Sequence, residues 1–180
     1  MSTETTPATN PQPASPQPIQ AAAAAVPPAA AAQAEVVPLP DCLVHVPIPF
    51  LGCSYPLKGY HAAASVTPDQ VAVAAEQLNQ AGFSLDTITG VDWLAEGQME
   101  IVYDYFHPIN GLRVVVRSRV PRIAAEIPTI SKIYAGANWH ERETHDFFGI
   151  QFSGHPDLTP FLLPEDATYH PLRKDFTACP

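Results

Sequence analysis

The sequence predicts an α+β fold, in which a two-layer domain of helices packed on a largely antiparallel sheet is followed by a long extended C-terminal segment. Three observations predict it: a helical pattern over 68–81, strand-like stretches between 83 and 120, and a second helical stretch from about residue 138. A helix, then a run of strands, then further helices is the order typical of α+β domains.

The first predicted helix covers 68–81. Thr67 is a favourable N-cap, and Pro68 suits the first helical position because its missing N–H has no partner there anyway. Apolar side chains recur at a spacing that places them on one face, and Gly82 is expected to end the helix. These core-facing residues are Val71, Ala74, Ala75 and Leu78.

Three strands are expected after this helix. Residues 83–93 are β-branched and partly alternating, and we expect this strand to end near Gly90. Stretches 99–107 and 112–120 flank Asn110-Gly111, a strong hairpin signal. The proline-containing lead-in over 41–66 is expected to be irregular or an edge strand, and a short helix is expected over 129–134 after Pro128.

The stretch NWHERETHDFFG over 138–149 invites comparison with a zinc-protease helix. Its histidines His140 and His145 are five residues apart, so on a helix they point roughly 140° away from each other. A zinc chelate needs the two histidines four apart on one face. A metal-dependent hydrolase using His140, Glu141, His145 or His155 is therefore only an alternative.

Asn138 is the expected N-cap of this helix, with Glu141 completing a capping box and Gly149 ending the helix. A helical wheel places one stripe on the apolar face, made of Trp139, Glu143, Asp146, Phe147 and Ile150. Buried carboxylates need either shifted pKa values or cationic partners. We expect Arg142 to reach Asp146, four residues later, and the C-terminal Arg173 and Lys174 to fold back on the helix or dock beside it.

The last thirty residues combine five prolines with many apolar side chains and no periodicity. Such a segment is expected to be covered, by its own domain or by the surface of another protein over which it extends. The predicted organisation is a disordered Ala/Pro-rich extension over 1–40, an α+β domain over 41–150, and a partner-wrapping segment over 151–180.

Composition excludes several classes of function. A net charge of −9 argues against nucleic acid as a partner, and Arg113, Arg117 and Arg119 share one strand face that is expected to be solvated or partner-facing. No Lys or Arg precedes Lys58, so neither a secretory signal nor a transit peptide is expected, and the three cysteines suit a reducing, cytosolic compartment. A free-standing adaptor that recruits proline-binding domains through the tail is a further alternative.

Several motifs resemble one known family. The run ANWHERETHDFFGIQFSGHPDL, followed by LLPED and HPLRKDF and preceded by GFSLDTITGVDW, YDYF and VRSRVPR, is similar to the 30-kDa subunit of respiratory complex I, the bacterial NADH:quinone oxidoreductase, over roughly 66–176. The chain departs from that family at Thr159 and Pro160, where basic residues are usual. This departure keeps open a related assembly, such as a membrane-bound hydrogenase or another ion-pumping dehydrogenase.

The resemblance implies a non-catalytic peripheral-arm subunit of a proton-translocating NADH:quinone oxidoreductase at the cytoplasmic face of the bacterial inner membrane. It implies a hetero-oligomer with the 49-kDa-type subunit and cluster-bearing subunits, attached to the membrane only through the complex. FMN, iron–sulfur clusters and quinone would belong to the assembly, with no cofactor or metal on this chain. The matching interface or structural positions are Glu141, Arg142, Glu143, Asp146, Gly149, His155, Pro156, Leu158, Pro171, Arg173, Lys174 and Asp175.

Overall fold

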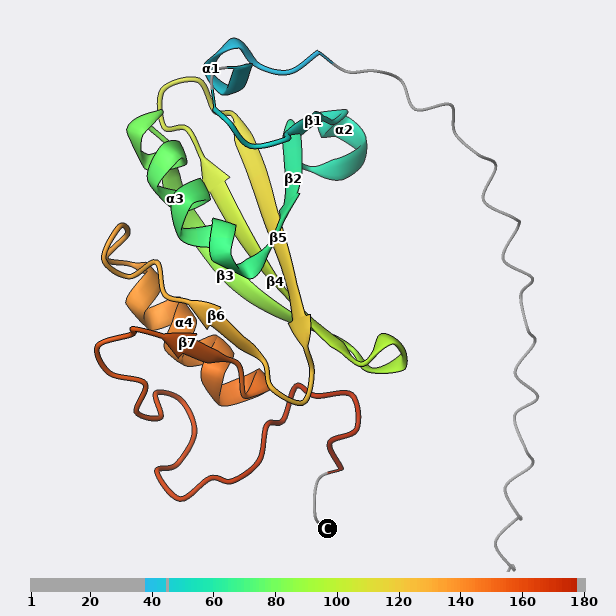
Figure 1. Cartoon of the computed structure of the whole chain (residues 1–180), viewed down its shortest axis with the longest axis vertical. Helices are drawn as coiled ribbons and strands as arrows, with labels where there is room; N and C mark the ends of the chain where they lie inside the picture. The colour runs from blue at the N-terminus through green and yellow to red at the C-terminus, as the bar shows by residue number, and fades with distance from the viewer. Residues whose placement is uncertain (1–37, 45, 178–180) are drawn as a thin grey trace, which may run out of the picture. The chain divides into compact units, whose positions relative to one another are not determined.

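The computed structural model describes residues 38–44 and 46–177, and within them a five-stranded sheet with the order β1-β2-β5-β4-β3 (Figure 1). The pairs β3–β4, β4–β5 and β1–β2 are antiparallel, whereas β2 runs parallel to β5. The bounds are β1 Leu51–Gly52, β2 Ala62–Val66, β3 Ser84–Trp93, β4 Gln98–Phe106 and β5 Arg113–Pro121. The predicted α+β class with a largely antiparallel sheet is confirmed. The predicted extension over 1–40 lies outside the described residues except for 38–40.

The lead-in over 41–66 is more regular than predicted. It contains the short helices α1 (Asp41–Val44) and α2 (Tyr55–Lys58), and β2 lies inside the sheet between β1 and β5. Strand β2 has the sequence AAASV, and alanine has little strand propensity of its own. Ala62 and Ala64 are nevertheless buried in the core, so tertiary packing selects small side chains that local propensity does not favour.

Helix α3 (Val71–Gln80) follows a single 3₁₀ turn over Pro68–Gln70. The Thr67 N–H donates to Oε1 of Gln70 at 3.1 Å, which satisfies a donor at the start of this helical stretch. All four predicted core residues of the helix are buried, and Gly82 adopts φ +85° after its end. The prediction for 68–81 is confirmed except that its first turn is 3₁₀.

Strand β3 continues to Trp93, so the prediction that it ends near Gly90 is wrong. Val91, Asp92 and Trp93 all pair with β4 before the 3₁₀ turn Leu94–Glu96 reverses the chain. Gly90 lies inside the strand because helix α4 approaches closely: a Cβ there would lie 2.5 Å from Cδ2 of Phe148.

The β4–β5 hairpin is confirmed, with its last pair Phe106 and Arg113. The connection 107–112 is longer than a two-residue turn, and Gly111 within it has φ +68°. On the buried face of β4, Met99, Ile101, Tyr103 and Tyr105 join one core with residues of α3 and α4. Both helices therefore cover the same face of the sheet (Figure 1).

The predicted helix over 129–134 is wrong. Strand β6 (Glu126–Pro128) pairs in parallel with β7 (Gln151–Ser153), and turns follow β6. Ser131 N–H donates to the hydroxyl of Thr129 at 3.1 Å, and the Ile130 N–H donates to Glu141. The local Ser131–Thr129 bond and the bond to Glu141, eleven residues away, offer these backbone N–H groups an alternative to helical hydrogen bonds.

Helix α4 spans Ala137–Phe148 and ends at Gly149, which adopts φ +73°. The predicted stop is confirmed, but the predicted N-cap is wrong because Gly136 precedes the helix and Asn138 lies inside it. Glu141 binds Ile130 instead of reaching back to close a capping box. From Gly154 to Thr177 the described chain holds no helix or strand, and no helix within the described ranges is both long and apolar enough to cross a membrane.

Candidate functional site

The C-terminal end of α4 is bound by a short stretch of the C-terminal segment, His170 to Arg173. Nδ1 of His170 lies 2.8 Å from the carbonyl of Asp146, the N–H of Leu172 donates to the carbonyl of Phe147, and Nε of Arg173 donates to the carbonyl of Phe148 at 2.7 Å. The last carbonyls of a helix lack partners within it and favour cations nearby. The predicted fold-back is confirmed, although Arg173 binds main chain and not a carboxylate.

Gly149 permits this close approach. An added Cβ would lie 2.5 Å from Nε2 of His170 and 2.6 Å from Nη2 of Arg173. The positive φ of Gly149 is also a conformation that other residues adopt with strain. The end of α4, Gly149 and residues 170–173 are thus held together by these contacts.

Asp146 holds a second part of the C-terminal segment. Its Oδ2 accepts three backbone N–H groups, from Phe161, Leu162 and Leu163, at 2.8, 2.7 and 3.2 Å. Burial alone would raise the pKa of this carboxyl, but these donors outweigh it and the net pKa is lowered. Asp146 is therefore an anionic anchor for residues 161–163.

Arg142 does not pair with Asp146, so that prediction is wrong. Its guanidinium donates to the carbonyl and hydroxyl of Thr159 and to the carbonyl of Pro160, at 3.1 to 3.2 Å. It also lies over the rings of Trp139 and Phe161, at 5.5 and 5.1 Å from their centroids. Thr159 and Pro160 thus accept hydrogen bonds from an arginine of α4.

A third anchor centres on Asp92, which is buried on β3. Arg122 makes two bonds to its carboxylate, at 2.9 and 3.1 Å, and one to Asp175 at 2.5 Å, while the N–H of Lys174 donates to Asp92 at 2.8 Å. Hydrogen bonding from Arg122 lowers the pKa of Asp92. Sequence reasoning missed Asp92 and Arg122. Had the strand been extended past Gly90, the parity of Ile88 and Gly90 would have placed Asp92 on the buried face.

Glu141 is the second buried carboxylate of α4, with an exposure of 0%. It accepts the N–H of Ile130 at 2.7 Å and the hydroxyl of Thr129 at 2.5 Å, and Nε2 of His155 lies 3.7 Å away. Burial raises the pKa of Glu141 to about 7, against the lowering effect of the two hydrogen bonds, and burial lowers the pKa of His155. Glu141 ties α4 to the connection after β6.

The predicted apolar stripe of α4 is wrong in part. Glu143 and Trp139 are exposed, whereas the residues that α4 buries are Ala137, Glu141, Thr144, Asp146 and Phe148. The helix packs against β3 on one side and against residues 129–130 on another. Its buried residues therefore span a wider part of the helix surface than the predicted stripe and only partly coincide with it. The helical wheel therefore predicts the burial of Asp146 but not that of Glu141.

The remaining predicted positions divide by burial. Leu158 packs on the core and Pro171 is half-buried, whereas Pro156, Lys174 and Asp175 are exposed. Six large apolar side chains of α4 and the C-terminal segment are exposed and are here called the C-terminal apolar surface: Trp139, Phe161, Leu162, Tyr169, Leu172 and Phe176. The side chains of Leu162 and Leu172 are each 53% exposed. Their backbone N–H groups nevertheless donate to α4, to the side chain of Asp146 and to the carbonyl of Phe147.

No metal site accompanies these contacts within the described ranges, where no three His, Cys, Asp or Glu side chains are grouped to hold an ion. His145 bonds through Nδ1 to the carbonyl of Ile150 and does not meet His140. The hydrolase alternative gains no support from this geometry.

A family model, the respiratory-chain NADH dehydrogenase 30-kDa subunit, matches residues 64–179 of the sequence. This chain belongs to that family, as the motifs over 138–176 predict. The match includes α4, Gly149 and every residue that anchors the C-terminal segment.

Sequence relatives and a solved structure are consistent with this family assignment. An NADH-quinone oxidoreductase subunit of Roseiflexus castenholzii is 44% identical over 92 residues, 51% of this chain and 53% of the relative. A subunit of the F(420)H(2) dehydrogenase of Methanosarcina mazei is 39% identical over 100 residues, 53% and 61% of the two chains. A chain of the membrane-bound sulfane sulfur reductase, an archaeal respiratory membrane complex, superposes with a TM-score of 0.66 at 30% identity, covering 76% of this chain and 81% of the other. This chain spans about half the length of the first of these relatives.

Proposed function

We propose that this chain is a non-catalytic subunit in the peripheral arm of a proton-translocating NADH:quinone oxidoreductase. It docks on the larger 49-kDa-type subunit, beside cluster-bearing subunits, at the cytoplasmic face of the bacterial inner membrane. Family membership and the names of the relatives support the type of assembly. Electron transfer, FMN, iron–sulfur clusters and quinone belong to the other subunits.

One observation carries the docking proposal: the C-terminal segment is fixed by polar contacts while its apolar side chains face outward. Asp146 and Arg142 hold residues 159–163, and the helix end holds residues 170–173. Leu162 and Leu172 remain about half exposed. Exposed apolar surface on an ordered backbone suits a protein interface, because little entropy is lost when the partner binds.

A second candidate is the same docking role in a related ion-pumping assembly with a different electron donor. The similarity to the F(420)H(2) dehydrogenase chain and to the sulfane sulfur reductase chain favours it, since neither name includes NADH. Both candidates use the same surface of this chain. They differ in the subunits that supply and receive electrons.

The test is co-purification. An N-terminally tagged chain is expressed in its own host, membranes are solubilised gently, and the recovered subunits are identified by mass spectrometry. Recovery with flavin- and NADH-binding subunits supports the first candidate, and recovery with a hydrogenase-type or other dehydrogenase module supports the second. A lone monomer contradicts both.

A matched pair of variants locates the interface. Leu162→Asp with Leu172→Asp places charge on the C-terminal apolar surface and should abolish recovery of the large subunit. Ile109→Asp changes a side chain that is 90% exposed in the β4–β5 connection and should leave recovery unchanged. Equal recovery of the two variants would remove the proposed interface.

A further inference from the structure

A second surface lies on the face of the sheet opposite α3 and α4. Arg113, Arg117 and Arg119 alternate along β5 with residues of the buried core, and all three form ion pairs on this open face, as the shared parity predicts. This face is separate from the α4 end that anchors the C-terminal segment. It therefore requires an explanation of its own.

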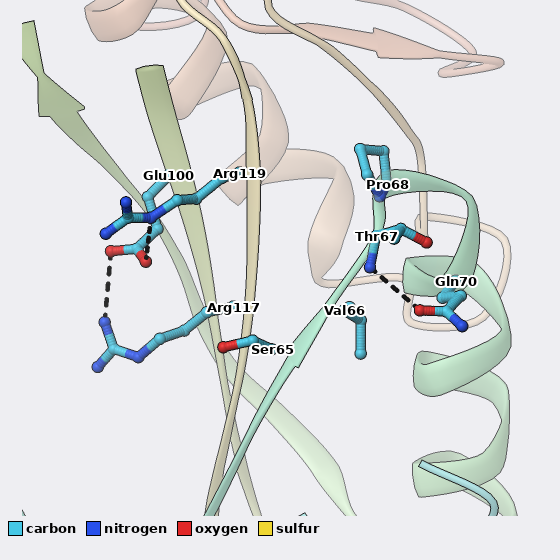
Figure 2. A pocket seen from close by; sticks show the side chains of 8 residues that line it. All are labelled: Ser65, Val66, Thr67, Pro68, Gln70, Glu100, Arg117 and Arg119. Atoms are coloured by element: carbon cyan, nitrogen blue, oxygen red, sulfur yellow. Dashed lines mark hydrogen bonds and ion pairs between the residues drawn. The ribbon is translucent and has the colours of Figure 1, made fainter. Parts of the chain in front are cut away.

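A hollow of about 370 Å³ lies where β2 ends beside β5 (Figure 2). Its lining includes Ser65, Thr67, Gln70, Glu100, Arg117 and Arg119. Figure 2 shows the carboxylate of Glu100 between the two guanidinium groups, with the Ser65 side chain on the same side of β2 as Arg117. Two cations and one carboxylate line the hollow, and a second carboxylate beside it, Glu96, pairs with Arg119.

The two arginines differ in how fully their donors are used. Arg119 donates to Glu96 at 2.6 Å and to Glu100 at 3.3 Å. The guanidinium of Arg117 makes one hydrogen bond within the described part of the chain, to Glu100 at 3.5 Å, the outer limit for such a bond. Since a guanidinium carries five N–H donors, Arg117 retains capacity for a second carboxylate.

An apolar side chain, Leu51, continues the surface on the other side of β2. Leu51 of β1 pairs with Ala63, which shares its face with Ser65, and Leu51 is 73% exposed. Strand β1 pairs only with Ala62 and Ala63, so over Ala64–Val66 no described strand covers the edge of β2 that faces away from β5. An open strand edge is a site where an extended chain can add by main-chain hydrogen bonds.

We infer that this surface, defined by Leu51, the edge of β2 and the Arg117 hollow, docks an extended acidic segment of another polypeptide. The segment lies along Ala64–Val66, one of its carboxylates binds Arg117, and a neighbouring apolar side chain packs on Leu51. A small free anion fits less well, because sites for small molecules enclose most of the ligand and this hollow lies on an open sheet face. This inference adds an interface to the proposed function and does not depend on the C-terminal apolar surface.

The test is site-specific photo-crosslinking in membranes that contain the full-length chain. The photoreactive residue p-benzoylphenylalanine replaces Ser65 in one variant, Leu162 in a second, and Ile109 in a third as control. Crosslinked peptides are identified by mass spectrometry. We expect Ser65 to capture a peptide of another subunit that carries Asp or Glu, and Ile109 to capture none.

A charge-reversal series completes the experiment. Arg117→Glu should lower the yield of the Ser65 crosslink by about tenfold or more, the effect of losing one charge-assisted contact, and Asp or Glu→Lys in the captured peptide should restore it. Yield unaffected by Arg117→Glu, capture of a second copy of this chain or of its own N-terminal residues, or no capture at Ser65 overturns the inference. Capture at Leu162 without capture at Ser65 overturns this inference alone, whereas failure at Leu162 counts against the proposed function.

Discussion

The two buried carboxylates of α4, Glu141 and Asp146, bind different parts of the chain. Glu141 accepts one backbone N–H and one hydroxyl from residues 129–130, inside the domain, whereas Asp146 accepts three backbone N–H groups from residues 161–163 of the C-terminal segment. Burial dominates at Glu141 and raises its pKa to about 7, while the donors dominate at Asp146 and lower its pKa. One end of the helix therefore stabilises the domain, and the other fixes the C-terminal segment.

The largest effect should come from Glu141→Ala. The change leaves the Ile130 N–H and the Thr129 hydroxyl without their acceptor in a fully buried site and removes side-chain volume. We expect the free energy of unfolding of the full chain to fall by about 3 kcal/mol, measured by urea denaturation. The matched control is Glu143→Ala, two residues away and exposed, for which we expect a change within about 0.5 kcal/mol. Similar losses in both variants would mean that the burial difference carries no energetic weight.

The raised pKa of Glu141 predicts a pH dependence of opposite sign to that of most carboxylates. Between the ordinary pKa of a glutamate and about 7, the folded state binds more protons than the unfolded state, so stability falls as pH rises through that window. The total loss is about 3 kcal/mol. Well above the folded-state pKa, from about pH 8, this contribution no longer changes.

Other titratable groups contribute to the pH dependence with different signs. The lowered pKa of His155 makes stability rise as pH increases through the ordinary histidine range, and the lowered pKa of Asp146 matters only at lower pH. Tyr103 and Tyr105 titrate far above this window. The difference between the wild type and Glu141→Gln isolates Glu141, and a pH-independent difference from pH 5 to 8 would show that Glu141 does not titrate there.

Asp146→Ala should release the C-terminal segment without unfolding the sheet. Three N–H groups lose their acceptor, but water can replace it once the segment opens. We expect a local loss of about 2 kcal/mol, seen as roughly thirtyfold faster hydrogen exchange at residues 161–163. Exchange of amides in β4 and β5 should be unchanged, and a uniform acceleration across the sheet would instead place Asp146 in the fold.

The smallest of these effects should come from Gly149→Ala. The left-handed backbone and the approach of His170 and Arg173 predict a loss of about 1 to 2 kcal/mol, with faster proteolysis of the segment after residue 158. Gly136→Ala at the other end of α4 is the control, because its φ is −64° and its Cβ would meet nothing within 4 Å. That change should be neutral or stabilising by about 0.5 kcal/mol. A greater loss at Gly136 than at Gly149 would reverse the comparison.

The fold was predictable where side-chain period and turn residues agree. The face of α3 follows from its helical spacing, and the β4–β5 hairpin follows from Asn110-Gly111. Strand β2 was not, because AAASV becomes a strand only through burial beside β5. The turns over 129–134 were mistaken for a helix because their hydrogen bonds involve Glu141, a residue distant in sequence.

The candidate site divides in the same way. Gly149 as a helix stop and the return of the HPLRK stretch to α4 were predictable from residue types near a helix end. The hydrogen-bond partners of Glu141 and Asp146 were not predictable, because backbone N–H groups occur at nearly every residue and no residue type identifies the ones that donate. Helical spacing predicts an ion pair between Arg142 and Asp146, whereas Arg142 binds Thr159 and main-chain carbonyls.

The most direct test measures the exposure of the C-terminal apolar surface before and after assembly. Hydroxyl-radical footprinting of the isolated chain and of the chain in purified complex compares Leu162 and Leu172, each 53% exposed, with Ile109 as an internal reference. We predict that labelling of the two leucines falls several-fold in the complex while labelling of Ile109 stays the same. Equal labelling of Leu162 and Leu172 in both states would contradict a partner-facing surface held by α4.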